Sequence, residues 1–340
     1  MIHTVSFPGL GLEFTLNREA VNIFGFSIYW YAVIIVSGAL LAWFYCSRKG
    51  PKLGISADDL IDMLIFAVPL GLIGARLYYI IFYLDLFRNP DGSLDFLRML
   101  STRDGGLAIY GGVIAAVIVL WFVCRHKKIS FLAFADLGAF GLLIGQCVGR
   151  WGNFVNVEAY GGLTALPWRM CSEKIANELF SQGLVDAAGW QQVMDGTLGV
   201  HPTFFYESLW NFVGFFLLVY LSRKWRKFDG QLFFTYLAWY GVGRGIIEGL
   251  RTDSLYFMNT PVRVSQVLGF VSALAGAALI AYFLSKKPRP EDLWVNRLAA
   301  RKAAAAEAAE PMDEIAAVNG EEQKSPNDEK EENSDAGDHH

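Results

Sequence analysis

The sequence predicts an all-α polytopic membrane protein with about seven transmembrane helices. The 340-residue chain is 54% hydrophobic and 15% aromatic, and only 18% of its residues are charged. Several apolar stretches reach the roughly 20 residues that a helix needs to cross a bilayer. Basic residues recur in alternate connections between these stretches, as is typical of cytoplasmic loops. These observations favour a membrane protein over a soluble domain with a single core.

Seven stretches have the length and hydrophobicity of transmembrane helices. They are residues 22–46, 60–84, 106–124, 131–149, 203–221, 230–250 and 264–284. The first twenty residues lack the basic start and compact apolar core of a cleavable signal peptide. We therefore expect the first stretch itself to direct insertion into the membrane.

Basic clusters follow the first, third, fifth and seventh stretches. They begin at Arg48, Arg125, Arg223 and Lys286. All four clusters would lie on one side of the membrane, and the positive-inside rule makes that side cytoplasmic. The N-terminus is then expected outside and the C-terminus inside.

This topology divides the chain into three parts. Residues 1–21 would form an N-terminal segment on the outer face, and residues 22–285 a seven-helix membrane domain with outer loops 85–105 and 150–202. The second loop is rich in apolar and aromatic residues, which favours contact with the membrane interface. Residues 286–340 would form an acidic cytoplasmic tail. Because it contains few apolar residues, the tail is expected to be largely disordered, with at most a transient helix in its alanine-rich part.

The strongest candidate site is GRWGNFVNVEAYG, residues 149–161, at the end of the fourth stretch. Polar groups are costly at membrane depth unless they face a protected cavity. Arg150 and Asn153 are three residues apart, so they share one face of a helix. Glu158 follows, where nearby glycines are expected to break the helix. The alternative is a helix end with a snorkelling arginine and a capping asparagine.

A second polar cluster lies on the sixth stretch. Tyr240, Arg244, Glu248 and Arg251 are separated by four, four and three residues, which places them on one helical stripe. An Arg244–Glu248 pair would by itself explain both charges. Two arginine-bearing helices that meet at headgroup depth would also suit a phosphate, because a guanidinium binds phosphate through paired hydrogen bonds.

Further polar residues lie in or near the other stretches. Tyr31, Arg76 and Tyr110 belong to the first three, and glycines beside Tyr110 permit close approach of a helix or a lipid. His201 and Glu207 lie at the entrance of the fifth. A lone histidine there is more often an interfacial or capping residue than a base.

Other functional classes find less support. The four cysteines lack ligand spacing, so neither a metal site nor a disulfide framework is predicted. Nothing indicates binding of nucleic acid. Transport of a lipid or solute is the main alternative, and its expected sign is a polar path that reaches both faces. Most candidate residues gather in the outer half. Asp136 is the exception, and a structural pairing explains it as well as a catalytic role does.

Six separated motifs resemble the prolipoprotein diacylglyceryl transferase family. In chain order they are WYAV around Tyr31, GARLYY around Arg76, GGLAIYGG around Tyr110, GRWGNFVNVEAYG, HPTFFYE from His201 and YGVGRGIIEGLR from Tyr240. The resemblance covers about residues 20–285 and leaves out the tail. One such motif would be weak, whereas the ordered set is highly specific.

The resemblance implies transfer of a diacylglyceryl group from phosphatidylglycerol to the thiol of the lipobox cysteine in a prolipoprotein signal peptide. It implies no metal or other cofactor, and a location in the bacterial cytoplasmic (inner) membrane with the site toward the outer face. The partners would be these substrates and membrane lipids, without nucleic acid. The implied catalytic residues are Arg150, Arg244, Tyr110, Glu158 and Glu248. The implied binding residues are Arg150, Asn153, Asn156, Tyr31, Arg76, Gly161, His201, Glu207, Tyr240 and Arg251.

The implied chemistry assigns charge stabilisation to the arginines. Negative charge develops on the departing phosphate, and preorganised donors such as Arg150 and Arg244 would stabilise it. Glu158 and Glu248 would hold the arginines in place or take part in proton transfer. Some family members carry an essential histidine where this chain has Tyr110. A tyrosine hydroxyl ordinarily stays protonated at neutral pH, so we expect Tyr110 to form a hydrogen bond and leave the thiol-activating base unassigned.

Overall fold

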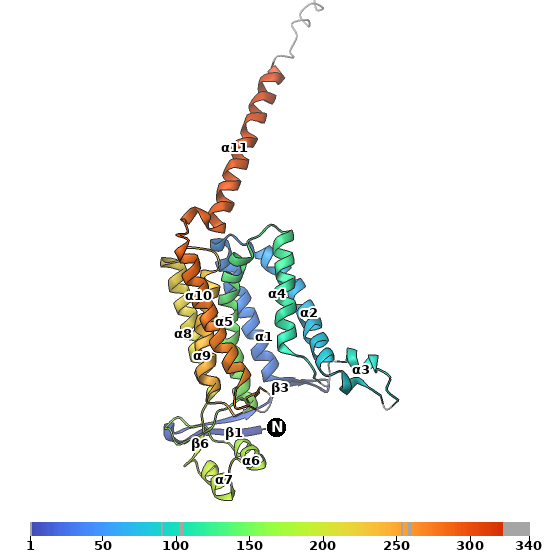
Figure 1. The fold of residues 1–340 in the computed structure, drawn as a ribbon, viewed down its shortest axis with the longest axis vertical. Coiled ribbons are helices and arrows are strands. Elements are labelled where there is room, and N and C mark those ends of the chain that lie inside the picture. Colours follow the sequence, from blue (N-terminus) through green and yellow to red (C-terminus); the bar gives the residue numbers. More distant parts are fainter. Residues whose placement is uncertain (1, 90, 102–104, 253, 258–259, 322–340) are drawn as a thin grey trace, which may run out of the picture.

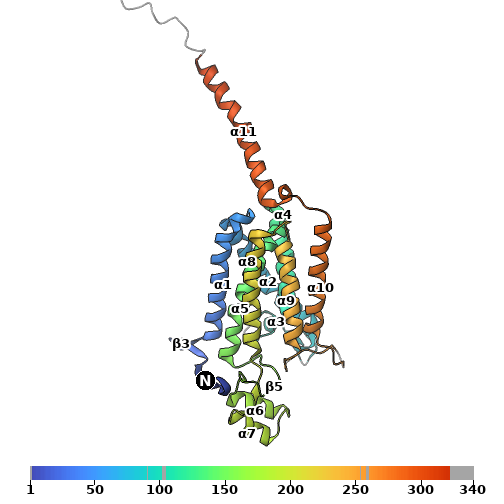
Figure 2. The same ribbon diagram turned by 90° about the vertical axis from the view of Figure 1, so that its left-hand side faces the viewer.

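Long helices lie side by side in the computed structural model, and short strands and helices cover one end of them (Figures 1 and 2). The structure describes residues 2–89, 91–101, 105–252, 254–257 and 260–321. The long helices of the bundle are α1 (Trp30–Lys49), α2 (Ala57–Phe82), α4 (Ile109–His126), α5 (Phe131–Asn156), α8 (Thr203–Lys224), α9 (Gln231–Glu248) and α10 (Val264–Ser285). Each predicted stretch therefore corresponds to one helix.

Six of the described helices are long and apolar enough to cross a membrane. They are α1, α2, α4, α5, α8 and α10. Apolar side chains cover their outer faces; Ile81 and Leu274, for example, are 70% and 72% exposed. So much exposed apolar surface is unfavourable in water and favourable in lipid. The chain is therefore a multi-pass membrane protein. Helix α9 falls outside this set because Arg244 and Glu248 lower its hydropathy.

Helix α5 is the central element of the bundle. It packs against α1, α8 and α9. Its side chains Leu137, Phe140 and Leu143 are completely buried in this packing. Since α5 touches three neighbours along its length, polar side chains in its last two turns are shielded from lipid. The packing thus places Arg150 and Asn153 inside the bundle.

The described residues are mostly helical but also form six short strands, and four of these strands lie before the first transmembrane helix. Strands β1 (Ile2–Phe7) and β2 (Leu12–Asn17) pair antiparallel, as do β3 (Glu19–Ile23) and β4 (Phe26–Tyr29). The first transmembrane helix consequently begins at Trp30 and not near residue 22. Gly11 and Gly25 have φ of 64° and 88° in the two connections, where glycine adopts a left-handed conformation without strain.

A small folded unit, here called the cap, covers the end of the bundle (Figure 2). It consists of β1, β2 and residues 160–200, which include β5 (Leu163–Thr164), α6 (Glu173–Ser181), α7 (Ala187–Met194) and β6 (Gly199–Val200). Val5, Ile175 and Leu179 are among its buried core residues. The second predicted outer loop is therefore a folded unit with its own core. Some of its apolar side chains, such as Phe180 and Leu184, nevertheless stay half exposed.

Helix α11 (Trp294–Glu321) extends from the opposite end of the bundle (Figure 1). A transient helix was predicted for the alanine-rich part of this segment, and alanine is the strongest helix former. Trp294 anchors the start of α11, because it is 7% exposed and its Nε1 donates to the carbonyl oxygen of Gly54 at 2.9 Å. Residues 322–340, which belong to the tail predicted to be disordered, lie outside the described residues.

Candidate active site

Three arginines converge on one buried carboxylate at the cap end of the bundle. Glu207 lies in the second turn of α8, and its side chain is 4% exposed. Its Oε1 accepts hydrogen bonds from Arg244 at 3.0 Å and from Arg251 at 3.3 Å. Its Oε2 pairs with Nη2 of Arg150. Among the described residues, this one carboxylate is therefore shared by three guanidinium groups.

The Arg244–Glu248 pair predicted from their spacing is present in the structure. Nη2 of Arg244 lies 2.6 Å from Oε2 of Glu248. The carboxylates of this cluster are nearly inaccessible, with side chains 2% exposed at Glu248 and 4% at Glu207. The side chains of Arg150 and Arg244 are 20% and 18% exposed. The accessible face of the cluster is therefore cationic, which suits an anionic ligand.

A second branch of the network runs along the end of α5. Arg150 donates to Asn153 at 3.4 Å, and the amide groups of Asn153 and Asn156 donate to Oε1 of Glu158 at 3.0 and 3.3 Å. Glu158 was expected to hold the arginines in place or to take part in proton transfer. In the structure it holds two amides, because α5 continues for a full turn beyond Gly152 and carries Asn153 and Asn156 toward it.

Glycines near Glu158 were predicted to break the helix. Gly152 does not end it. Helix α5 ends after Asn156, where Val157 takes a left-handed conformation with φ of 50°. A side chain at position 152 would place its Cβ 2.8 Å from Cδ2 of Tyr31. Gly152 therefore lets α1 approach α5 closely, so that the Tyr31 ring lies against the helix that carries Arg150.

Tyr31 also lines a cavity of about 480 Å³ beside this network. Arg18, Glu19 and Asn156 lie in the same wall, and Nε of Arg18 donates to Oδ1 of Asn156 at 3.3 Å. Arg18 is not among the residues predicted for the site, because no structure was predicted for the N-terminal segment. The short connection between β2 and β3 brings this arginine to the end of α5. In the described chain, the network thus joins four arginines to three glutamates.

Gly161 connects the cap to the segment after α9 that carries Arg251. Its N–H donates to the carbonyl oxygen of His201 at 2.9 Å, and it forms a β-bridge with Arg251. The imidazole Nδ1 of His201 lies 3.2 Å from the hydroxyl of Tyr206. Burial lowers the pKa of His201, so the ring is neutral at pH 7. These contacts give His201 a positioning role at this junction.

Alanine at position 161 is expected to lower activity by about tenfold to a hundredfold, because a misplacement of about 1 Å near a reacting centre has effects of that size. Its Cβ would lie 2.8 Å from both the Cβ of His201 and the carbonyl oxygen of Leu250. The neighbouring substitution Gly162→Ala is the control, since its nearest contact is 3.8 Å away. Initial rates of both purified variants test this. Equal rates would show that the junction tolerates the displacement.

Two predicted site residues are not brought into this hydrogen-bonded network. Arg76 donates to four backbone carbonyl oxygens, those of Arg98, Met99, Gly105 and Gly106, at 2.8 to 3.0 Å. It therefore fastens the connection between α2 and α4. Tyr110 lies in the first turn of α4 and is 41% exposed. Within the described residues it makes no hydrogen bond to the arginine network.

Phenylalanine at position 110 is expected to lower the initial rate by up to about tenfold, the effect of losing one hydrogen bond to substrate. Tyr110→Ala should reduce the rate further, because it also removes packing. Rates of the wild type and the phenylalanine variant should be compared across the pH range. Complete loss of activity in a folded Tyr110→Phe protein, or a changed pH profile, would instead make the hydroxyl a proton donor or acceptor in the reaction.

Tyr240 and Asp136 complete the set of predicted polar residues. Tyr240 lies one turn before Arg244 and stacks on Tyr236, with ring centroids 5.6 Å apart. Asp136 is fully buried at the other end of α5 and accepts hydrogen bonds from Arg226 and from two backbone N–H groups before and within the first turn of α9. These contacts support the structural interpretation of Asp136.

The apolar helices and their buried charged network define an integral membrane protein with a polar site at one end of the bundle. Comparison with known proteins identifies the family. The family model described as prolipoprotein diacylglyceryl transferase matches residues 18–282, so the chain belongs to this family of transferases. The resemblance inferred from the six motifs is thereby confirmed.

Individual relatives agree with this assignment. A protein of Bacillus cytotoxicus named phosphatidylglycerol–prolipoprotein diacylglyceryl transferase is 43% identical over 260 residues, which covers 76% of this chain and 89% of that protein. A protein of the same name from Finegoldia magna is 39% identical over 264 residues, covering 78% and 94%. The family match over residues 18–282 includes α1 to α9, most of α10 and the cap residues 160–200.

Proposed function

We propose that this enzyme transfers the diacylglyceryl group of phosphatidylglycerol to the thiol of the lipobox cysteine of prolipoproteins. The products are a thioether-linked lipoprotein precursor and glycerol phosphate. The observation that carries the proposal is the convergence of Arg150, Arg244 and Arg251 on the single carboxylate of Glu207. This arrangement leaves positive charge for a phosphodiester at the place where apolar helices meet the cap.

The arginines are suited to the bond that breaks in this reaction. The cysteine sulfur forms a bond to the terminal glyceryl carbon, and the bond from that carbon to a phosphate oxygen breaks. The electron pair of the broken bond stays on the phosphate, whose charge increases. Arg150 and Arg244 would bind the phosphate through paired hydrogen bonds and stabilise this charge. Because buried carboxylates already hold both side chains, little reorganisation is needed during the reaction.

Glu158 is the best placed proton acceptor in this proposal. Glu207 and Glu248 are committed to arginines, whereas in the described part of the network Glu158 accepts only amide hydrogen bonds, from Asn153 and Asn156. In this proposal Glu158 would accept the thiol proton, because in the described network its carboxylate is not bound to an arginine. The substrate supplies the nucleophilic cysteine, so no cysteine of the enzyme takes part.

The proposed membrane topology has seven spans, with α9 as the sixth, and lies in the bacterial cytoplasmic membrane. The cap and the active site would face outward, and α11 would face the cytoplasm. The buried packing of α9 between α8 and α10 supports a span that is more polar than the others. A polar helix is tolerated in a membrane when it faces the protein interior.

Cysteine labelling is expected to place the cap outside. Phe180→Cys and Leu184→Cys introduce thiols at positions that are about half exposed in the cap. Both should react with a membrane-impermeant maleimide added to whole cells or spheroplasts. A cysteine introduced at exposed Arg301 in α11 should react only after lysis and serves as the opposite-side control. Labelling of the cap only after lysis would reverse the orientation and remove the active site from the outer face.

Transport is less well supported than transfer. A carrier needs a polar path between both faces, but Leu137, Phe140, Leu143 and Ile144 are buried between Asp136 and the arginine cluster along α5. Asp136 also forms a structural ion pair with Arg226. These apolar side chains therefore separate Asp136 from the polar residues at the other end of α5.

One assay tests the proposed reaction directly. Purified enzyme is incubated with phosphatidylglycerol labelled in its glycerol headgroup and with a peptide that contains a lipobox cysteine. Release of labelled glycerol phosphate that requires the peptide thiol, together with a peptide mass increased by one diacylglyceryl group, is the expected result. A serine-substituted peptide is the control. No release in the presence of both substrates would contradict the proposal.

A further inference from the structure

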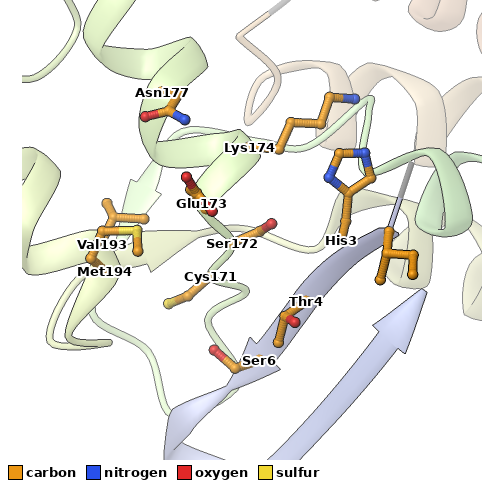
Figure 3. Close-up of a pocket in the computed structure, with 11 residues that line it drawn as sticks. His3, Thr4, Ser6, Cys171, Ser172, Glu173, Lys174, Asn177, Val193 and Met194 are labelled. Carbon is orange, nitrogen blue, oxygen red and sulfur yellow. The ribbon is translucent and has the colours of Figure 1, made fainter. Parts of the chain in front are cut away.

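A second cavity lies within the cap, between strand β1 and the segment that leads into α6 (Figure 3). Its volume is about 600 Å³. Strand β1 forms one wall through His3, Thr4 and Ser6, and the beginning of α6 forms the opposite wall through Ser172 and Lys174. The lining is largely polar, although the cavity adjoins the apolar core of the cap.

Strand β1 presents a free edge to this cavity. Ser6 exchanges two backbone hydrogen bonds of 2.9 Å with Cys171, on the side away from its β2 partner. In an antiparallel strand, every second residue directs its N–H and C=O to the same edge. The backbone groups of Thr4 therefore point the same way as those of Ser6. In the described chain, no backbone group pairs with Thr4 on that edge.

Two side-chain atoms in the cavity wall also lack hydrogen-bond partners among the described residues. They are Oγ of Ser172 and Nε2 of His3. Ser172 is 7% exposed and stands at the N-cap of α6, but its side chain makes no capping hydrogen bond. Burial and the nearby Lys174 lower the pKa of His3, so its ring is neutral at pH 7. Buried polar groups left unpaired are unfavourable, so a ligand that supplies donors and acceptors would be stabilised here.

The cavity is connected to the arginine network through Lys174. Its Nζ donates to the carbonyl oxygens of Asn156 and Val157, at 2.7 and 2.9 Å. Asn156 lies six residues beyond Arg150 on α5, which is about 9 Å along the helix axis. An extended peptide covers this distance with about three or four residues. A substrate held at the arginines could therefore reach the edge of β1 with its next few residues.

We propose that the cap binds the segment that follows the lipobox cysteine, as an added strand on the free edge of β1 at Thr4. Ser172 and His3 would supply further hydrogen bonds to the backbone of this segment. The inference rests on the proposed transferase function and assigns a binding site to a part of the substrate that does not react. Strand addition recognises main-chain groups, so it would let one enzyme accept substrates of many sequences.

The Cys171 thiol in the same wall has no part in this inference. It donates to the carbonyl oxygen of Leu198 at 3.2 Å, and burial raises its pKa to about 11. The thiol is therefore protonated and occupied at neutral pH, and it is not a second acceptor of the diacylglyceryl group.

Two peptide substrates test the inference. One ends directly after the lipobox cysteine, and the other continues for about ten residues. With wild-type enzyme, KM should be about tenfold lower for the long peptide, the effect expected of two or so added hydrogen bonds. Equal KM values for the two peptides would overturn the inference. If wild-type enzyme transfers to neither peptide, the proposed function itself has failed.

A proline substitution tests the hydrogen-bonding edge of β1 without changing the rest of the cap. Thr4→Pro removes the N–H that faces the cavity, while pairing with β2 is kept because that N–H points away from β2. This variant should lose the tenfold advantage of the long peptide and keep the wild-type KM for the short peptide and for phosphatidylglycerol. Thr15→Pro is the matched control, because Thr15 faces Thr4 across the hairpin and its N–H points to the other edge.

The substrate offers a version of the test that does not alter the enzyme. A long peptide whose amides after the cysteine are N-methylated cannot add as a strand. With wild-type enzyme its KM should rise to that of the short peptide. Two results would show that the cap does not bind the segment through its backbone. One is a methylated long peptide that keeps its low KM with wild-type enzyme. The other is a Thr4→Pro enzyme whose KM rises equally for the short and the long peptide.

Discussion

Lysine at position 150 or 244 is expected to lower kcat/KM for diacylglyceryl transfer by about 100- to 1000-fold, the effect of removing one preorganised donor from a developing anion. The two terminal nitrogens of Arg244 bind the carboxylates of Glu207 and Glu248. Those of Arg150 bind Glu207 and Asn153. A lysine ammonium cannot make both contacts at once, because it is a compact charge without the planar fork. The loss should appear mainly in kcat, since the added interaction forms in the transition state.

The measurement is release of glycerol phosphate by purified variants in detergent or nanodiscs. Arg88→Lys is the matched control, because its side chain is 49% exposed and its partner among the described residues is the exposed Asp85. The two lysine variants should elute and unfold like the wild type. Near-normal turnover in both would mean that paired hydrogen bonds from these arginines do not stabilise the departing phosphate.

Glutamine at position 207 is expected to abolish turnover and to destabilise the protein by about 3–5 kcal/mol, the usual cost of removing one partner of a buried ion pair. Glu207 is the carboxylate to which Arg150, Arg244 and Arg251 all bind. Without its charge, three guanidinium groups would face one another around a neutral amide. They would repel each other and lose the positions that the reaction requires.

Thermal unfolding in detergent and the glycerol phosphate assay together test this expectation. Glu13→Gln, on exposed strand β2, is the control and should change neither quantity. Added phosphatidylglycerol or inorganic phosphate should partly restore the stability of Glu207→Gln, because an anion can replace the missing charge. A variant with normal stability and activity would show that the arginines are positioned by other contacts.

Most of the bundle could be predicted because each apolar stretch carries its own signal. The length of a membrane-crossing helix and the hydrophobicity of its residues are local properties, and all seven predicted stretches are helices in the structure. The Arg244–Glu248 pair was predictable for the same reason, since residues four apart share a helical face. The N-terminal strands were missed, although alternating residues and two glycine turns preceded Trp30.

The centre of the arginine network was beyond such local arguments. Glu207 stood in the sequence as one polar residue at the entrance of a helix, while the structure makes it the partner of three arginines from other segments. The hydrogen bonds that Glu158 accepts from Asn153 and Asn156 were not predicted either. Arg18 reaches Asn156 across 138 positions of the chain. No spacing rule relates residues so far apart.

The sequence by itself determined the membrane class, the helices and the family, because hydrophobicity, helical periodicity and ordered motifs are all written along one chain. Only the tertiary structure decided which carboxylate holds which arginine, which of the predicted residues share one network, and how the cap closes over it. The physical reason is that buried charges are paired across helices by packing, and packing is set by the shapes of many residues together. Gly152 and Gly161 illustrate this, since each is required by a side chain or loop that only the folded chain brings near.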